Sequence, residues 1–373
     1  MELPLKYFIS TGEPSGEASG VTLAEAIRRY DPGARFEGIG AARMRAAGIA
    51  LWRDHTGWAS MGPAAAIPRI PKLLLVMLQT AAHIVASKPD LVVLVDFGVF
   101  NLRLARQLRR MKYAGPILDL FPPGTWLDDE EKARRVSSAC IPVTAFKHQY
   151  DFYRGLGCRI EFFGHPLTGR YALRPRKEPP PPDGGRVAIL PGSRSGELRR
   201  HLPVLAAAFA RLQARRPKLQ GVIGAANVRA EQRITETIAR EGLNEVSVIR
   251  GVAEALAGAD GAWVCSGTAV LETALLGVPA VALYVIPPAL IWYGKRMIRH
   301  SYITLPNLVL SREVIPEFLQ DDATPERLAD TLEGLMTDSA RQYADYAEMR
   351  EALGPSDALE RCAKFAVELA RAG

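Results

Sequence analysis

Cysteine and histidine are scarce in this chain, with only four and six copies among 373 residues. Neither type forms a cluster with metal-ligand spacing, and the cysteines lie far apart, at Cys140, Cys158, Cys265 and Cys362. The sequence therefore argues against a zinc-bound or disulfide-stabilised domain and favours packed thiols in the reducing cytoplasm. It also lacks an Asp-x-Asp string that would hold a divalent ion, so we expect neither a metal site nor a cofactor.

Apolar runs that could span a membrane are lacking as well. Residues 273–294 carry no charge, but they include Gly277, Pro279, Pro287 and Pro288. These residues suit a helix end, a buried strand and a loop. Residues 3–10 have the length of a strand and lead into a glycine-rich turn, which is not the pattern of a signal peptide. We expect a protein that is soluble or peripheral to a membrane.

The charge is moderately basic, with a formal net charge of +7. The basic residues are scattered, and no stripe of alternating aromatic and basic side chains marks a nucleic-acid surface. An acidic ligand or an anionic membrane surface fits this charge better than nucleic acid does.

Short apolar runs alternate with amphipathic helical patterns along the whole chain, for example at 7–10, 91–95, 187–190 and 262–265. This alternation predicts parallel sheets in an α/β fold, and the length predicts two domains. We expect two Rossmann-like domains facing a cleft, the GT-B arrangement. The expected parts are a first domain at 1–172, a proline-rich linker at 173–185, a second domain at 186–345, and a helix at 346–373 that packs back on the first domain.

Two segments of the second half combine a strand end, a tight turn and a helix start. They are Leu-Pro-Gly-Ser-Arg-Ser-Gly-Glu at 190–197 and Ser-Gly-Thr-Ala-Val-Leu-Glu at 266–272. Such turns direct backbone N–H groups and a helix N-terminus toward a phosphate. Arg194 can neutralise a diphosphate, and Glu272 can accept hydrogen bonds from two vicinal ribose hydroxyls.

Either segment alone is also typical of an ordinary turn in a doubly wound sheet. The two in series, one with an arginine and one with a glutamate, favour a UDP-sugar site. No Gly-Lys-Ser/Thr ending is present, which argues against a P-loop, and the glycine spacing at 12–20 is not the dinucleotide fingerprint. The residues predicted here to bind the nucleotide sugar are Gly192, Ser193, Arg194, Ser266, Gly267, Thr268 and Glu272.

Together with further motifs, these segments give the chain a resemblance to a known family. The motifs are Gly-Glu-Pro-Ser-Gly-Glu at 12–17, Gly-Ile-Gly at 38–40, Asp96 with Phe-Asn-Leu-Arg-Leu-Ala at 100–105, Gly-His-Pro-Leu at 164–167, the two turns, Leu-Pro-Asn at 305–307 and Ile-Pro-Glu-Phe-Leu-Gln at 315–320. In this order they resemble the lipid-A-disaccharide synthase family, which are membrane-associated inverting glycosyltransferases. The resemblance covers nearly the whole chain.

The resemblance implies metal-independent transfer of 2,3-diacylglucosamine from its UDP donor to 2,3-diacylglucosamine 1-phosphate at the cytoplasmic side of the inner membrane. It does not determine the acyl-chain length or whether the protein is a monomer or a homodimer. It adds Asn307, Glu317 and Gln320 to the donor site. On the acceptor side it implies Gly12, Glu13, Ser15, Gly16 and Asn101.

Three positions depart from the family's pattern. The second acid of its Asp-x-x-Asp-Phe-Asn string, the usual candidate base, is Val99 here. The final Asp of its first glycine-rich turn is Glu17, and its tryptophan-rich stretch is reduced to Pro-Pro-Gly-Thr-Trp at 122–126. A valine cannot accept a proton, so the candidate replacement bases are Asp96, Glu13 and Glu17. The predicted catalytic residues are Asp96, Glu17 and, for the leaving group, Arg194. Asp96 is equally compatible with a helix cap, and Glu17 and Glu13 with capping or solvated charges.

Two other functions stay open at this point. One is another UDP-N-acetylglucosamine transferase or an epimerase on the same scaffold. The other is a catalytically silent nucleotide-sugar-binding protein, which Val99 suggests.

A membrane-contacting segment is predicted at 61–84, which is apolar with interspersed basic residues. Its uncharged part, 73–87, is too short to cross a bilayer, but it could lie in the interface with Ile67 and Ile70 of the proline-interrupted part. The alternative for 73–84 is a buried helix of the first domain.

Overall fold

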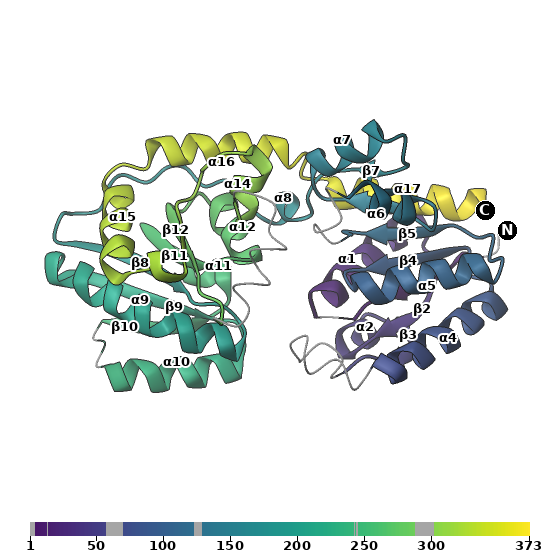
Figure 1. The fold of residues 1–373 in the computed structure, drawn as a ribbon, viewed down its shortest axis with the longest axis horizontal. Coiled ribbons are helices and arrows are strands. Elements are labelled where there is room, and N and C mark those ends of the chain that lie inside the picture. The colour runs from purple at the N-terminus through teal and green to yellow at the C-terminus, as the bar shows by residue number, and fades with distance from the viewer. Residues whose placement is uncertain are drawn as a thin grey trace. The chain divides into compact units, whose positions relative to one another are not determined.

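The computed structural model describes residues 4–12, 14–56, 70–122, 129–241, 243, 245–287 and 302–373, which form two compact units (Figure 1). Unit 1 consists of residues 1–169 and 353–373, and unit 2 of residues 170–352. Each unit contains one parallel sheet with helices packed against it. The predicted α/β fold class, two Rossmann-like domains of the GT-B type, is confirmed.

Unit 1 is built on a seven-stranded sheet in the order β3-β2-β1-β4-β5-β6-β7. Its strands are β1 (Lys6–Ser10), β2 (Arg35–Gly40), β3 (Ala50–Asp54), β4 (Leu91–Val95), β5 (Ile117–Leu120), β6 (Ile141–Thr144) and β7 (Glu161–Phe162). Its helices are α1 (Pro14–Tyr30), α2 (Ala42–Ala46), α4 (Ile70–Ser87), α5 (Gly98–Arg110), α6 (Glu130–Ser137), α7 (Lys147–Gly155) and α17 (Ala358–Ala372). Helix α8 (Leu167–Arg170) ends where the chain passes into unit 2.

Unit 2 has a six-stranded sheet in the order β10-β9-β8-β11-β12-β13. Its strands are β8 (Gly184–Leu190), β9 (Lys218–Ala225), β10 (Val246–Arg250), β11 (Gly261–Cys265), β12 (Ala280–Tyr284) and β13 (Glu317–Leu319). Its helices are α9 (Ser195–Arg215), α10 (Val228–Glu241), α11 (Val252–Ala255), α12 (Thr268–Leu275), α14 (Leu305–Leu310), the 3₁₀ turn η3 (Gln320–Asp322), α15 (Pro325–Thr337) and α16 (Ala340–Ala352).

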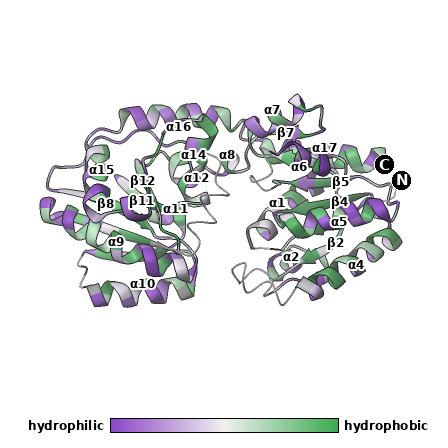
Figure 2. Cartoon of the chain, in the orientation of Figure 1, coloured by the Kyte–Doolittle hydropathy of each residue, from purple (hydrophilic) through white to green (hydrophobic). Residues whose placement is uncertain are grey.

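The central strands are apolar on both faces because helices cover both sides of each sheet. All five residues of β4 and all five of β11 are buried. Trp263 of β11 is fully buried, and its indole N–H donates to the backbone oxygen of Leu328 at 2.9 Å. Helices such as α5 and α10 carry bands of both colours in Figure 2, as amphipathic helices on a sheet should.

The C-terminal helix α17 belongs to unit 1, although the chain reaches it only after completing unit 2. Cys362, Ala363, Ala366 and Val367 of α17 are buried in the same core cluster as Leu23 and Ile27 of α1. Small residues dominate this face, so the two helices can approach closely.

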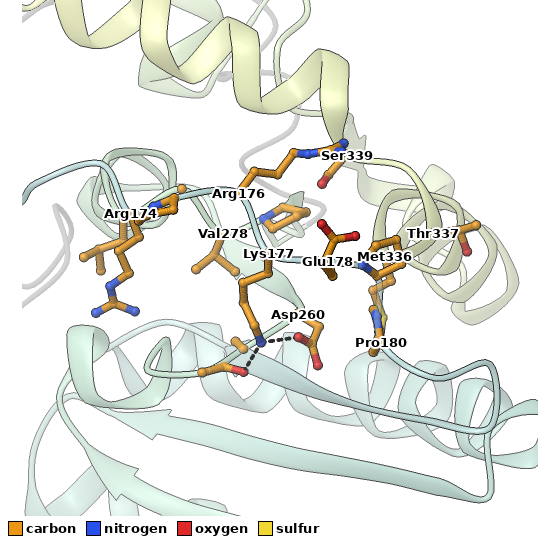
Figure 3. Close-up of a pocket in the computed structure, with 17 residues that line it drawn as sticks. Arg174, Arg176, Lys177, Glu178, Pro180, Asp260, Val278, Met336, Thr337 and Ser339 are labelled. Atoms are coloured by element: carbon orange, nitrogen blue, oxygen red, sulfur yellow. Dashed lines mark hydrogen bonds and ion pairs between the residues drawn. The ribbon is translucent and has the colours of Figure 1, made fainter.

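The proline-rich segment at 174–180 packs on unit 2 at the amino ends of β8 and β11. There Lys177 Nζ donates to the backbone oxygen of Gly258 at 2.9 Å and pairs with Asp260 (Figure 3). Arg174 donates to the backbone oxygen of Leu256 at 3.3 Å. These contacts surround a pocket of about 210 Å³. It lies at the opposite strand ends from the predicted nucleotide turns, and these two cations already have protein partners.

No helix in the described ranges combines the length and apolar character needed to cross a bilayer.

Candidate active site

The two predicted nucleotide turns lie side by side in unit 2. Strands β8 and β11 are hydrogen-bonded neighbours, and the sheet continues to β9 on one side and to β12 on the other. This is a topological switch point, where open α/β sheets bind ligands at the carboxyl ends of the strands. A pocket of about 330 Å³ lies there, and its lining includes Gly192, Ser193, Arg194, Ser266, Gly267, Thr268 and Glu272.

The turn after β8 is held by Glu197, a buried residue of the first turn of α9. Its carboxylate accepts the N–H groups of Ser193 and Arg194, both at 3.0 Å. Gly192 has φ +107°, and a Cβ there would lie 2.6 Å from Glu197 Oε2. In this structure the protein itself accepts the Ser193 and Arg194 N–H groups, so their predicted contact with a phosphate stays a prediction.

Arg194 keeps its role as a candidate ligand through its side chain. The guanidinium contacts Glu197 Oε1 at 3.1 Å, yet the side chain is 77% exposed at the pocket. The first-turn N–H groups of α9 have no intrahelical partner, as in any helix. A diphosphate could therefore meet both the arginine and a helix N-terminus.

The turn after β11 is open on its ligand side. Gly267 has φ +153°, and a Cβ built on it would meet nothing within 4 Å. Ser266 is fixed through its N–H, which donates to the backbone oxygen of Leu283 at 3.1 Å. Helix α12 begins directly afterwards at Thr268, so its first-turn N–H groups point to the same end of the sheet.

Glu272 lies in α12 and lines the pocket. Its Oε2 accepts the hydroxyl of Tyr171 at 3.0 Å, a contact that the sequence did not reveal. Burial raises the pKa of Glu272, while the Tyr171 hydrogen bond and the nearby Arg170 oppose the rise. Tyr171 is itself tied to α16 because Arg350 donates to its backbone oxygen at 2.6 Å.

A second residue that sequence analysis missed is His201 of α9. Its Nδ1 lies 2.9 Å from the backbone oxygen of Pro191, and its Nε2 accepts the N–H of Val285 at 3.0 Å. These partners require a neutral ring with the proton on Nδ1, and burial lowers its pKa. The histidine thus joins the turn after β8 to the segment after β12.

Three residues predicted to bind the donor make hydrogen bonds within unit 2. Asn307 is fully buried, and its amide bonds to the backbone of Val314 and Ile315 at 2.8 Å. Glu317 accepts hydrogen bonds from Ile303, Thr304 and Asn307, all at the start of α14. Gln320 accepts the N–H of Ile286 at 2.8 Å. These polar groups are paired within unit 2, and the donor-binding role of Asn307, Glu317 and Gln320 stays a prediction.

Unit 1 has its own switch point, between β1 and β4. The glycine-rich turn follows β1, and Asp96 follows β4 directly with φ +40° and an exposed side chain. A Cβ on Gly12 would lie 2.2 Å from the Phe97 ring, and one on Gly16 would lie 3.2 Å from Asp96 Cβ. The glycines are therefore needed for close packing around Asp96. Glu13 and the Ser15 side chain lie outside the described residues.

Glu17 and Asn101 have structural roles. Glu17 is buried and its Oε1 accepts the N–H groups of Ala41 and Met44, both at 2.9 Å, so it caps the start of α2. Asn101 is fully buried, accepting from Ser10 Oγ at 2.9 Å and donating to the backbone oxygen of Val95 at 3.3 Å. Burial and these bonds favour structural roles for both residues, and their predicted roles as base and acceptor ligand stay predictions.

Comparison with known proteins identifies the family. The lipid-A-disaccharide synthetase family matches residues 7–366. The lipid-A-disaccharide synthase of Myxococcus xanthus is 33% identical, with 99% of this chain and 98% of that protein covered. The chain belongs to the lipid-A-disaccharide synthase family. Another member, from Syntrophus aciditrophicus, is 34% identical, with 97% of each chain covered.

Solved structures agree on the fold. The UDP-GlcNAc 2-epimerase of Neisseria meningitidis bound to UDP-GlcNAc has a TM-score of 0.63 at 10% identity, over 98% of this chain and 100% of that one. The calicheamicin glycosyltransferase CalG4 has the same TM-score of 0.63 at 16% identity, over 98% of both chains. At these identities, the similarity shows a common GT-B fold and nothing about function.

Val99 occupies the position where the synthase family usually has an acid, and its side chain cannot replace that acid. Val99 is 66% exposed in the first turn of α5. A second carboxyl group, which sequence analysis missed, lies in the neighbouring strand: Asp119 of β5 is 3% exposed. Burial and the nearby Asp96 raise its pKa to about 7. The only sequence signal was a charged residue within the apolar run Ile-Leu-Asp-Leu of 117–120.

Proposed function

We propose that this chain transfers 2,3-diacylglucosamine from UDP-2,3-diacylglucosamine to 2,3-diacylglucosamine 1-phosphate, giving lipid A disaccharide 1-phosphate and UDP. Membership of the synthase family over nearly the whole chain carries this proposal. The pocket at the switch point of unit 2 supports it, because helix N-termini, an exposed arginine and a glutamate meet there.

The donor binds in unit 2 through its UDP part. First-turn N–H groups of α9 and α12, together with the Arg194 guanidinium, contact the diphosphate. Glu272 accepts hydrogen bonds from the ribose hydroxyls through the oxygen that Tyr171 leaves available. The diphosphate gains negative charge as its bond to the sugar breaks, so these same donors stabilise the leaving group.

The acceptor hydroxyl is activated in unit 1 by Asp96. This side chain is exposed at the carboxyl end of β4, whereas the alternative base Glu17 is buried and bonded to two N–H groups. The N-cap residue of α5 is Phe97, so Asp96 does not occupy the capping position. Direct attack of the hydroxyl on the anomeric carbon displaces UDP and inverts that centre.

The test is UDP release by the purified protein with both acylated substrates. UDP formed only when donor and acceptor are present supports the transferase. UDP formed from UDP-N-acetylglucosamine without a lipid acceptor would assign another enzyme class. UDP affinity without any turnover would identify a silent binding protein.

Of the predicted membrane-contacting segment, residues 61–69 with Ile67 lie outside the described residues. We further propose that α4, which forms the rest of it, rests on the cytoplasmic face of the inner membrane. Over 18 residues it contains one lysine and no other Lys, Arg, Asp or Glu, and it is largely green in Figure 2. Its core face, Val76, Met77 and Ile84, is buried. Leu74, Leu75 and Leu78 lie on the outer face and are 38%, 56% and 47% exposed. The buried-helix alternative thus accounts for one face of α4, and the lipid surface accounts for the other.

A further inference from the structure

Asp119 is a buried carboxyl group that the proposed reaction does not yet use. In the parallel pairing of β4 and β5, Leu94 is the partner of Asp119, and Asp96 follows two residues beyond Leu94. Ile117 packs in the core cluster that also contains Leu94. Because side chains alternate along a strand, Asp119 points to the same face as these two residues. The two acids therefore lie at adjacent strand ends of the unit 1 switch point.

Among the residues that the structure describes, no cation shifts the pKa of Asp119. The titratable groups that interact with it are Asp96 after β4, Cys140 before β6, and Tyr153 of α7. The pKa values of Cys140 and Tyr153 are both raised by burial, so both groups are neutral at physiological pH. Of these three groups, only Asp96 raises the pKa of Asp119.

We propose that Asp96 and Asp119 work as one carboxyl pair, in which Asp96 takes the proton of the acceptor hydroxyl and the buried Asp119 sets the proton affinity of Asp96. This rests on the proposed function. The hydroxyl O–H bond breaks and its proton goes to Asp96. The oxygen forms a bond to the anomeric carbon, and the bond from that carbon to the UDP oxygen breaks with its electron pair leaving on UDP. The proton then passes from Asp96 to solvent.

The pair explains how an exposed aspartate can act as a base without the family's acid at Val99. An isolated exposed carboxylate is a weak base, because its ordinary pKa lies well below neutrality. An ionised neighbour disfavours a second negative charge and so raises the proton affinity of the group that is exposed to substrate. Asp119 acts through Asp96, and is thus a positioning residue, not a catalytic one.

The first test is the pH dependence of kcat/KM for Asp119→Asn, a change that keeps shape and removes charge. The wild type is expected to show an ionisation near pH 7 that the variant lacks, with activity lowered about 10- to 100-fold. Calorimetric UDP affinity should stay unchanged, since the UDP pocket is in unit 2. Asp151→Asn, on the surface of α7 and paired with Lys147, is the matched control and should keep the wild-type profile. An unchanged profile and rate in Asp119→Asn would overturn the pair.

A second test does not depend on activity. Carbon-13 NMR of aspartate-labelled protein should show one carboxyl group titrating near pH 7, absent in Asp119→Asn. In Asp96→Asn this titration should move to lower pH, because the neighbouring negative charge is gone. A titration that does not move in Asp96→Asn would refute the coupling even if transfer occurs. A shift without any transfer would retain the pair and refute the proposed function.

Discussion

The acidic side chains near the two strand-end sites differ in their burial and in their hydrogen bonds. Glu17 and Glu197 each accept two backbone N–H groups and are buried, so their carboxylates stabilise turns and helix starts. Asp96 and Glu272 remain at a strand end and at a pocket wall. The residue type was predictable from the sequence, but the bonding state was not, because it depends on segments distant in the chain such as Ala41 for Glu17.

Arg194→Ala should abolish most activity and leave the fold intact. The side chain is 77% exposed and pairs only with Glu197 among the described residues, so its loss changes packing little. Loss of a contact to the developing charge should lower kcat by about 10²- to 10³-fold. Steady-state UDP release measures this effect. Arg211→Ala on the same helix, which pairs with Glu326, is the control and should remain active. Near wild-type turnover of Arg194→Ala would rule out the assignment.

His165 should make the protein less stable in mild acid. Burial lowers its pKa from 6.5 to about 4, and its Nδ1 accepts the N–H of Leu167 at 3.1 Å. Below pH 6.5 the His165 ring takes up a proton in the unfolded chain but stays neutral in the folded protein. The free energy of unfolding therefore falls until about pH 4. The loss at this site amounts to about 3 kcal/mol, and none is expected above pH 6.5.

Calorimetric melting between pH 7.5 and 4.5 tests this effect. His165→Asn retains an acceptor without the titration, so its melting temperature should depend less on pH. Part of the slope should persist, because burial lowers the pKa of His201 as well. His148→Asn, at an exposed position, is the control; equal slopes in all three proteins would contradict the prediction.

At the scale of elements, the sequence was most informative where a pattern is local. The apolar runs of β4 and β11 and the turns after β8 and β11 were predictable, because burial on both faces and tight turns leave a signature in adjacent residues. The hydrogen bonds of Glu317 and Gln320 were not, since their partners Thr304 and Ile286 come from other segments. Asp119 was also missed because its environment is created by neighbouring strands.

Gly192→Ala should disturb the turn after β8 more than an equally strained glycine elsewhere. Both Gly192 and Gly258 have positive φ, at +107° and +73°, so alanine is strained at either position. At Gly192 the new Cβ would also displace Glu197, whereas at Gly258 only Arg186 Cδ lies within reach, at 4.0 Å. Each variant should lose about 1–3 kcal/mol of stability. Calorimetry should show at least tenfold weaker UDP binding for Gly192→Ala and unchanged binding for Gly258→Ala. Equal affinities of the two variants would show that the position of Glu197 does not affect UDP binding.

At the scale of the whole molecule, surface charge and the apolar face of α4 act together. A protein with a formal net charge of +7 is attracted to anionic lipid at long range, and the attraction is screened by salt. Leu74, Leu75 and Leu78 supply the apolar contact that salt does not screen. Neither part alone should hold the protein on a membrane, because weak electrostatic attraction and a short apolar face each give reversible binding.

Replacing Leu74, Leu75 and Leu78 with serine should move the protein from anionic vesicles to the soluble fraction in flotation. The melting temperature should not fall, because these side chains point away from the core face of α4. Val228 and Ile249 of unit 2 are 52% and 37% exposed, and their double serine variant is the control that should still float. Wild-type flotation should weaken between 0.05 and 0.5 M salt, at roughly the range where the Debye length falls from above to below 10 Å. A triple variant that floats like wild type, or one that melts well below it, would place these leucines in packing and not in membrane contact.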